Sequence, residues 1–117
     1  MAANVVHNPR PLLAHLVSEE KKRNASLVAR YQDILRDLPR GRAYVRKKGD
    51  RAYLYLSRRV AGRKYPESKY VGSVHSEQAK KIQQQLRDRA RLESELAALE
   101  IERRMIEKAL HEYRRTR

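Results

Sequence analysis

The first forty residues carry apolar side chains at the spacing of a helix. Pro9 and Pro11 suit the first turn of a helix, and Pro39 with Gly41 marks its end, so the pattern predicts helical structure over residues 9–38. The apolar positions are Leu12, Leu13, Leu16, Val17, Leu27, Val28, Tyr31, Ile34, Leu35 and Leu38. Residues 18–24 contain no apolar side chain, so one long helix and two helices that meet near Asn24 both satisfy the pattern.

Between residues 42 and 72 the apolar positions repeat every two residues, which is the period of a β-strand. Tight connections at residues 48–50 and 61–64 separate three strands, so the segment predicts an antiparallel meander. One face carries Ala43, Val45, Ala52, Leu54 and Leu56. The other face carries Tyr53, Tyr55 and Ser57, whereas the faces of Tyr44 and Tyr70 depend on the register of the strands and stay open.

Residues 76–113 contain no Gly or Pro and predict one long helix, which Ser76 can cap. Such a helix is roughly 57 Å long, which is more than a three-stranded sheet can cover. Its apolar stripe can pair with the first helix in a helical hairpin or with a second copy of the chain in a coiled coil. The candidate pairing residues are Leu92, Leu96, Leu99, Ile106 and Leu110, and Ala97, Ile101 and Met105 widen the stripe on one side.

These elements predict the α+β class, in a single domain over residues 1–117. The expected order is an N-terminal helix or helix pair, a three-stranded antiparallel meander, and a long C-terminal helix that forms a hairpin or a coiled coil. No internal repeat or linker-like stretch divides the chain.

Composition restricts the function classes that the chain can belong to. It has 117 residues, 28 Lys and Arg against 14 Asp and Glu, a net charge of +14, and no Cys, Trp or Phe. A chain this small rarely forms the walled cavity of a small-molecule enzyme, so we expect no cofactor. Without cysteine it has no disulfides, and without an apolar run of about 18 residues we expect a cytoplasmic protein with no membrane partner.

The positive charge is concentrated in the predicted sheet, because residues 40–69 carry 11 basic and 2 acidic residues. Lys and Arg neutralise phosphates and exposed Tyr rings stack on bases, so the combination is typical of a nucleic-acid surface. A solvated positive face, with tyrosines as ordinary strand formers, is the alternative interpretation. The candidate nucleic-acid-binding residues are Arg42, Arg46, Lys47, Lys48, Arg51, Tyr53, Tyr55, Arg58, Arg59, Arg63, Lys64 and Lys69.

The residues that could support catalysis are scattered along the chain. The four histidines, His7, His15, His75 and His111, do not have metal-ligand spacing. The serines of the sheet region and the following cap lack a recognisable base and orienting group. We therefore expect neither a metal site nor an enzyme.

Four short motifs precede the long charged helix: Leu38-Pro39-Arg40-Gly41, Tyr53-Leu54-Tyr55-Leu56, Gly62-Arg63-Lys64 and Lys69-Tyr70-Val71-Gly72. With these motifs the chain resembles a small family of uncharacterised bacterial and phage proteins. The resemblance covers roughly residues 38 to 112. The same strands are more weakly similar to the N-terminal sheet segments of some transposases and phage-type integrases, which bind DNA, and this similarity implies DNA rather than RNA as the ligand.

The sequence therefore predicts a non-enzymatic nucleic-acid-binding protein, with duplex DNA as the expected polymer, that acts as an accessory or regulatory factor of a bacterium or mobile element. The alternative is a protein-interaction module, such as a phage inhibitor or adaptor, that docks onto a nucleoprotein complex through its helical arm. A homodimer or a protein partner on the C-terminal helix is compatible with both hypotheses.

Overall fold

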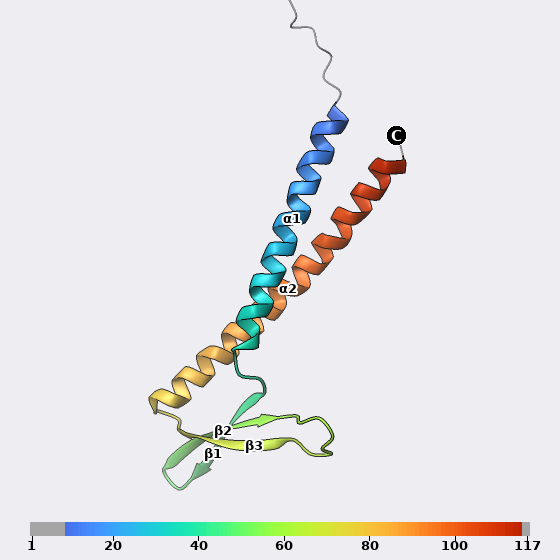
Figure 1. The fold of residues 1–117 in the computed structure, drawn as a ribbon. Coiled ribbons are helices and arrows are strands. Elements are labelled where there is room, and N and C mark those ends of the chain that lie inside the picture. Colours follow the sequence, from blue (N-terminus) through green and yellow to red (C-terminus); the bar gives the residue numbers. More distant parts are fainter. Residues whose placement is uncertain (1–8, 116–117) are drawn as a thin grey trace, which may run out of the picture. The chain divides into compact units, whose positions relative to one another are not determined.

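The computed structural model describes residues 9–115, which fall into two compact units. Helix α1 (Pro9–Arg36) is followed by strands β1 (Arg42–Lys48), β2 (Arg51–Arg58) and β3 (Glu67–Ser73) and by helix α2 (Glu77–Arg115) (Figure 1). This order confirms the predicted α+β fold class. The sheet unit comprises residues 34–93, and the hairpin unit comprises the described residues before and after it. Each helix contributes residues to both units. The single domain expected over residues 1–117 stays a prediction.

Helix α1 is continuous through the polar stretch that separates its two apolar segments, so the single helix is the correct alternative. No Gly or Pro interrupts this stretch, and Asn24 within it is buried, with only 1% of its surface exposed. Its amide nitrogen donates to the carbonyl oxygen of Leu99, at 2.8 Å, and to a carboxylate oxygen of Glu102, at 3.4 Å. The polar stretch therefore helps to hold α1 against α2.

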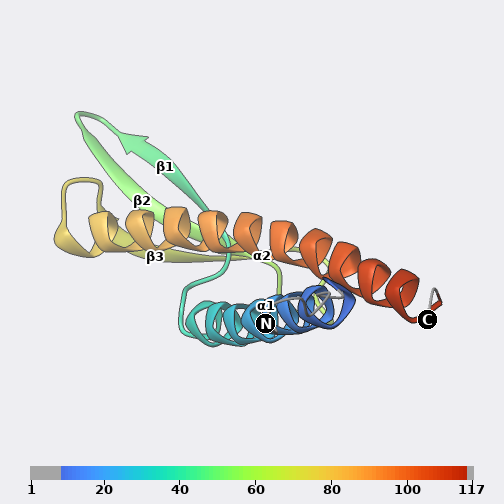
Figure 2. The ribbon, with the colours of Figure 1, turned by 90° about the horizontal axis from the view of Figure 1, so that it is seen from above.

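In the hairpin unit α1 and α2 lie side by side and run antiparallel (Figure 1, Figure 2). The predicted pairing residues of this unit are buried or half-buried: Leu96, Leu99, Ile106 and Leu110. The fifth, Leu92, is buried within the sheet unit. The predicted hairpin is therefore present, and the stripe is used at least in part within one chain.

The sheet has the order β1-β2-β3 with both pairs antiparallel, as the meander predicts. A two-residue turn at Gly49 and Asp50 joins the first two strands, and Gly49 has the positive φ, 62°, that such turns favour. The core of the sheet unit forms where Leu54 and Leu56 of the central strand and Ala79 of α2 are buried. One face of the sheet is thus packed around Leu54 and Leu56, whereas the side chains of the other face are half-buried or exposed.

Both helix ends in the sheet unit are fixed by side chains. Ser76 caps α2 as predicted, because its Oγ accepts a hydrogen bond from the backbone nitrogen of Ala79 at 3.2 Å. At the end of α1, the Arg89 side chain reaches across from α2, and its Nη1 donates to the carbonyl oxygens of Leu35, at 2.8 Å, and Leu38, at 3.2 Å. These contacts anchor the segment that leads into β1.

Candidate nucleic-acid interface

Four tyrosines from the three strands lie on the same face of the sheet, opposite the face of Leu54 and Leu56. Tyr44 of β1 and Tyr70 of β3 both pair with Tyr55 of β2, on its two sides. Tyr53 is two residues before Tyr55 and therefore shares its face. The register thus assigns the two tyrosines whose faces the sequence left open, and we call this surface the tyrosine face.

Tyr70 reaches the tyrosine face because of a β-bulge in β3. Gly72 pairs with Leu54, and Tyr70 pairs with Tyr55, so Val71 is an extra residue without an opposite partner. In a regular ladder Tyr70 would pair with the residue after Tyr55 and point to the buried face. A glycine inside a strand is a known mark of a bulge, and Gly72 was the signal in the sequence that could have indicated it.

The four rings form one continuous cluster. The Tyr44 and Tyr55 rings are stacked, with centroids 5.6 Å apart and an interplanar angle of 16°. Tyr70 packs at tilted angles against Tyr55, at 5.5 Å, and against Tyr53, at 6.1 Å. The hydroxyl of Tyr44 also lies 2.6 Å from Oγ of Ser68, at hydrogen-bond distance. Each ring pair contributes about 0.5–1.5 kcal/mol beyond area burial, so the cluster presents its rings in fixed positions.

Arg46 brings a positive charge directly to the rings. Its guanidinium carbon lies 5.4 Å from the centroid of Tyr55 and 5.9 Å from that of Tyr44, within cation–π range. A guanidinium that lies over a ring keeps N–H donors at its edge, and these donors match phosphate oxygens. Strand alternation places three further predicted cations on this face: Arg42, Lys48 and Arg51.

The remaining predicted cations lie elsewhere in the sheet unit. Alternation places Lys47, Arg58 and Lys69 on the face of Leu54 and Leu56. Two of them, Arg58 and Lys69, line a groove of about 630 Å³ that also includes Ile82 of α2. Arg59, Arg63 and Lys64 lie in the loop between β2 and β3. In that loop Arg63 forms an ion pair with Glu67 at 2.9 Å, and Nζ of Lys64 lies 5.8 Å from the centroid of the exposed Tyr65 ring.

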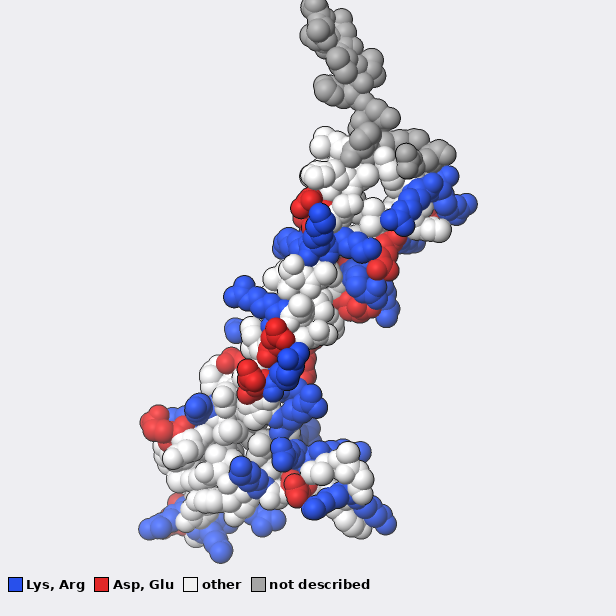
Figure 3. All heavy atoms as spheres, viewed as in Figure 1, with Lys and Arg blue, Asp and Glu red and all other residues white. Residues whose placement is uncertain are grey.

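The two units differ in net charge. Residues 34–93 carry 17 basic and 6 acidic residues, a net charge of +11, whereas the hairpin unit carries 10 and 8, a net charge of +2. Blue side chains with few red ones gather over the strands in Figure 3, while both colours alternate along the hairpin. The positive field therefore belongs to the unit that carries the tyrosine face.

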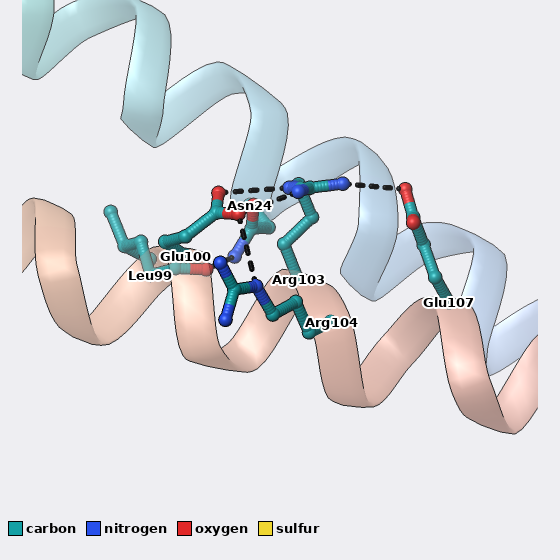
Figure 4. A network of polar contacts seen from close by, with 6 residues as sticks. All are labelled: Asn24, Leu99, Glu100, Arg103, Arg104 and Glu107. Atoms are coloured by element: carbon teal, nitrogen blue, oxygen red, sulfur yellow. Dashed lines mark hydrogen bonds and ion pairs between the residues drawn. The ribbon is translucent and has the colours of Figure 1, made fainter.

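The hairpin unit instead holds a local ion-pair network on α2 (Figure 4). Arg103 contacts Glu100 at 2.6 Å and Glu107 at 2.9 Å, and Arg104 contacts Glu100 at 3.4 Å. The hydrogen bond from Arg103 is the largest cause that lowers the pKa of the Glu100 carboxyl below its ordinary value of 4.5. These four charged side chains of α2 thus pair with one another along the helix.

Within residues 9–115, no group of three or more His, Cys, Asp and Glu side chains is placed to share a metal ion. No helix in this described part combines the length and the hydropathy that crossing a bilayer requires. Comparison of the chain with protein-family models, curated proteins and solved structures finds no match. The case for a function therefore depends on the geometry of the tyrosine face.

Proposed function

We propose that this chain is a non-enzymatic nucleic-acid-binding protein that contacts duplex DNA through the tyrosine face. The observation that carries the proposal is a cluster of four tyrosine rings, two of which the Arg46 guanidinium covers, on the sheet face opposite Leu54 and Leu56. Rings and guanidinium planes pack on bases and sugars, and the surrounding cations neutralise phosphates. We infer an accessory or regulatory role in a bacterium or mobile element from the resemblance of the strands.

The dimensions of the sheet support a duplex as the polymer. The outer strands of a three-stranded sheet are separated by about 10 Å, which is two strand spacings. The major groove of B-DNA is about 12 Å wide and admits a two-stranded ribbon, so two adjacent strands of the sheet can enter it with the side chains of the tyrosine face toward the bases. A net charge of +11 on 60 residues also favours the most densely charged polyanion available, and duplex DNA carries one charge per ~1.7 Å.

The test is a fluorescence-anisotropy titration of labelled duplex DNA, single-stranded DNA and structured RNA, from about 50 to 200 mM salt. The informative variant is Arg42→Gln with Arg46→Gln, which removes two charges from the tyrosine face. We expect weaker duplex binding and a salt slope shallower by about 1.8, because each phosphate contact contributes about 0.9. Its matched control is Lys47→Gln with Lys69→Gln, which removes two charges from the other face of the same sheet.

The outcomes distinguish binding through the tyrosine face from attraction by the overall positive charge. Equal losses in both double variants would mean that overall charge alone attracts the polymer, and the tyrosine face would have no part in binding. Preference for single-stranded DNA or RNA at the upper salt would contradict the duplex. Loss of all binding by about 200 mM salt in the unmodified chain would reject nucleic acid as the ligand.

A further inference from the structure

The hairpin unit buries little of its apolar surface. Among its described residues, Asn24 and Leu110 are the buried side chains, because two helices side by side cannot enclose an interior. Large apolar side chains stay exposed on both helices, including Leu16 at 51% and Met105 at 67%. Leu12, Leu13 and Ile101 are exposed to a similar degree. Exposed apolar surface of this extent on one unit indicates a contact with another molecule.

Three of these exposed residues, Leu13, Leu16 and Met105, line an open apolar groove between the two helices. One section, of about 320 Å³, is lined by Leu16, Val17, Met105, Ile106 and Ala109, with Glu20 and Glu102 at its margin. The adjoining section, of about 340 Å³, shares Val17 and Ala109 and adds Leu13, Leu110 and Tyr113. Both helices thus contribute to one surface that side chains of a further helix or helix pair can fill.

Charge favours another copy of the chain as the occupant. The sheet unit has a net charge of +11, so two such units repel each other, but the hairpin unit has a net charge of +2 with both signs along each helix. Two hairpins related by a two-fold axis therefore meet with little repulsion, and each carries the same apolar groove.

The hairpin face is also large enough for a stable contact. The α2 portion, residues 94–115, is about 33 Å long, and two helices 8–10 Å apart span roughly 18–20 Å. The face then measures on the order of 600 Å² in flat projection, and its accessible area is greater because side chains form ridges. A standard interface needs about 800 Å² from each partner.

We propose that a second copy of this chain covers the groove, so that two hairpin units form a four-helix bundle. The bundle places the exposed leucines and Met105 of each copy in a shared core. This inference does not depend on the proposed function, since it concerns the unit with the smaller charge.

The first test measures the molar mass of the full chain by sedimentation velocity, at total concentrations from about 1 to 200 µM in about 0.3 M salt. We expect a shift from 13.8 kDa to twice that mass as concentration rises. The variant Leu16→Glu with Met105→Glu places carboxylates in the groove and should weaken dimerisation at least ~100-fold, since burying unpaired charges is unfavourable. The control, Ala25→Glu with His111→Glu, adds the same charge on the far sides of the helices and should dimerise normally. Ala25 is nine residues after Leu16 and His111 is nine residues after Glu102, a separation that points the side chains in opposite directions from the helix axis.

A second test does not require the groove variant to fold. The chain has no cysteine, so Ala109→Cys introduces a single thiol in the groove, and Ala25→Cys introduces one on the far side of α1. A short bis-maleimide should cross-link the first variant into dimers and leave the second as monomers. A monomer at 200 µM, or equal cross-linking of the two cysteine variants, would overturn the proposal, as would equal weakening of dimerisation by the groove and control glutamates.

Discussion

Arg89 should be a major determinant of the stability of the sheet unit, and Arg89→Met tests this directly. The side chain is 13% exposed, and its Nη1 donates to the carbonyl oxygens of Leu35, in the last turn of α1, and of Leu38, two residues after the helix ends. Its Nε also lies 3.0 Å from a carboxylate oxygen of Glu93. Methionine keeps the aliphatic length of arginine but cannot donate, so both carbonyls lose the arginine donor while most of the packing remains. The Leu35 carbonyl keeps its hydrogen bond from the backbone nitrogen of Leu38, at 3.2 Å.

The expected loss follows from these distances. A hydrogen bond to a charged donor contributes about 1.5–3 kcal/mol, and here one nitrogen serves two acceptors, the second at the longer distance of 3.2 Å. The ion pair with Glu93 adds little, because that carboxylate is exposed to solvent and screened. We therefore expect the free energy of unfolding to fall by about 2–3 kcal/mol, which is roughly a 30- to 140-fold change in the unfolding equilibrium.

Urea denaturation followed by circular dichroism measures this loss. With a slope of about 2 kcal/mol per molar urea, the midpoint should fall by about 1–1.5 M. Arg91→Met is the matched control, because Arg91 lies on the same helix, is exposed, and has its nearest acidic oxygen, on Asp88, at 3.9 Å. The control should change stability by less than about 0.5 kcal/mol. Equal midpoints for the two variants would refute the anchoring role of Arg89.

Three further substitutions test other parts of the fold. Gly41→Ala should destabilise the chain by about 1–3 kcal/mol, because φ is +127° and a Cβ would lie 2.5 Å from the carbonyl oxygen of Ser57. Gly62→Ala, which has open space around it, should lower the melting temperature less, and the reverse order in thermal melts would contradict this explanation. Asn24→Ala removes a buried donor and should lower the free energy of unfolding by about 1–3 kcal/mol in urea titrations, a result that an unchanged midpoint would exclude. Glu100 has a lowered pKa in the folded state, so its ionised form stabilises the fold above the ordinary pKa of 4.5, and this contribution is lost as pH falls through the folded value. Glu100→Gln should therefore melt below the unmodified chain near neutral pH and together with it in strong acid, whereas a constant difference would assign the effect to something other than ionisation.

Much of the fold follows from local features of the sequence. The period-two pattern in the strands, the turn glycine Gly49 and the cap at Ser76 each act within a few residues, and the structure confirms all three. The burial of Asn24 within α1 does not follow from such features, because its amide donates to the carbonyl oxygen of Leu99, far along the chain. The pattern of apolar residues is interrupted there by a polar stretch, and the pattern alone does not distinguish an exposed break between helices from a buried polar contact.

In the candidate site, too, some features follow from neighbouring residues and others depend on how the strands pair. Tyr53 and Tyr55 were assigned to one face by alternation alone, and the register confirms this. Tyr70 joins them only through the bulge at Val71, which reverses the side to which the rest of β3 points. The bulge also places Lys69 on the face of Leu54 and Leu56, so one extra residue in β3 changes which predicted residues share the tyrosine face.

The tyrosine cluster has an optical consequence. The chain has seven tyrosines and no tryptophan or phenylalanine, so its near-ultraviolet circular dichroism and its intrinsic fluorescence come from tyrosine alone. Four of these chromophores are packed against one another on a single face, and such fixed, asymmetric packing is what produces a near-ultraviolet dichroism signal. The protein thus carries a built-in, label-free reporter on this surface, and a ligand that inserts between or over the rings must change the spectrum.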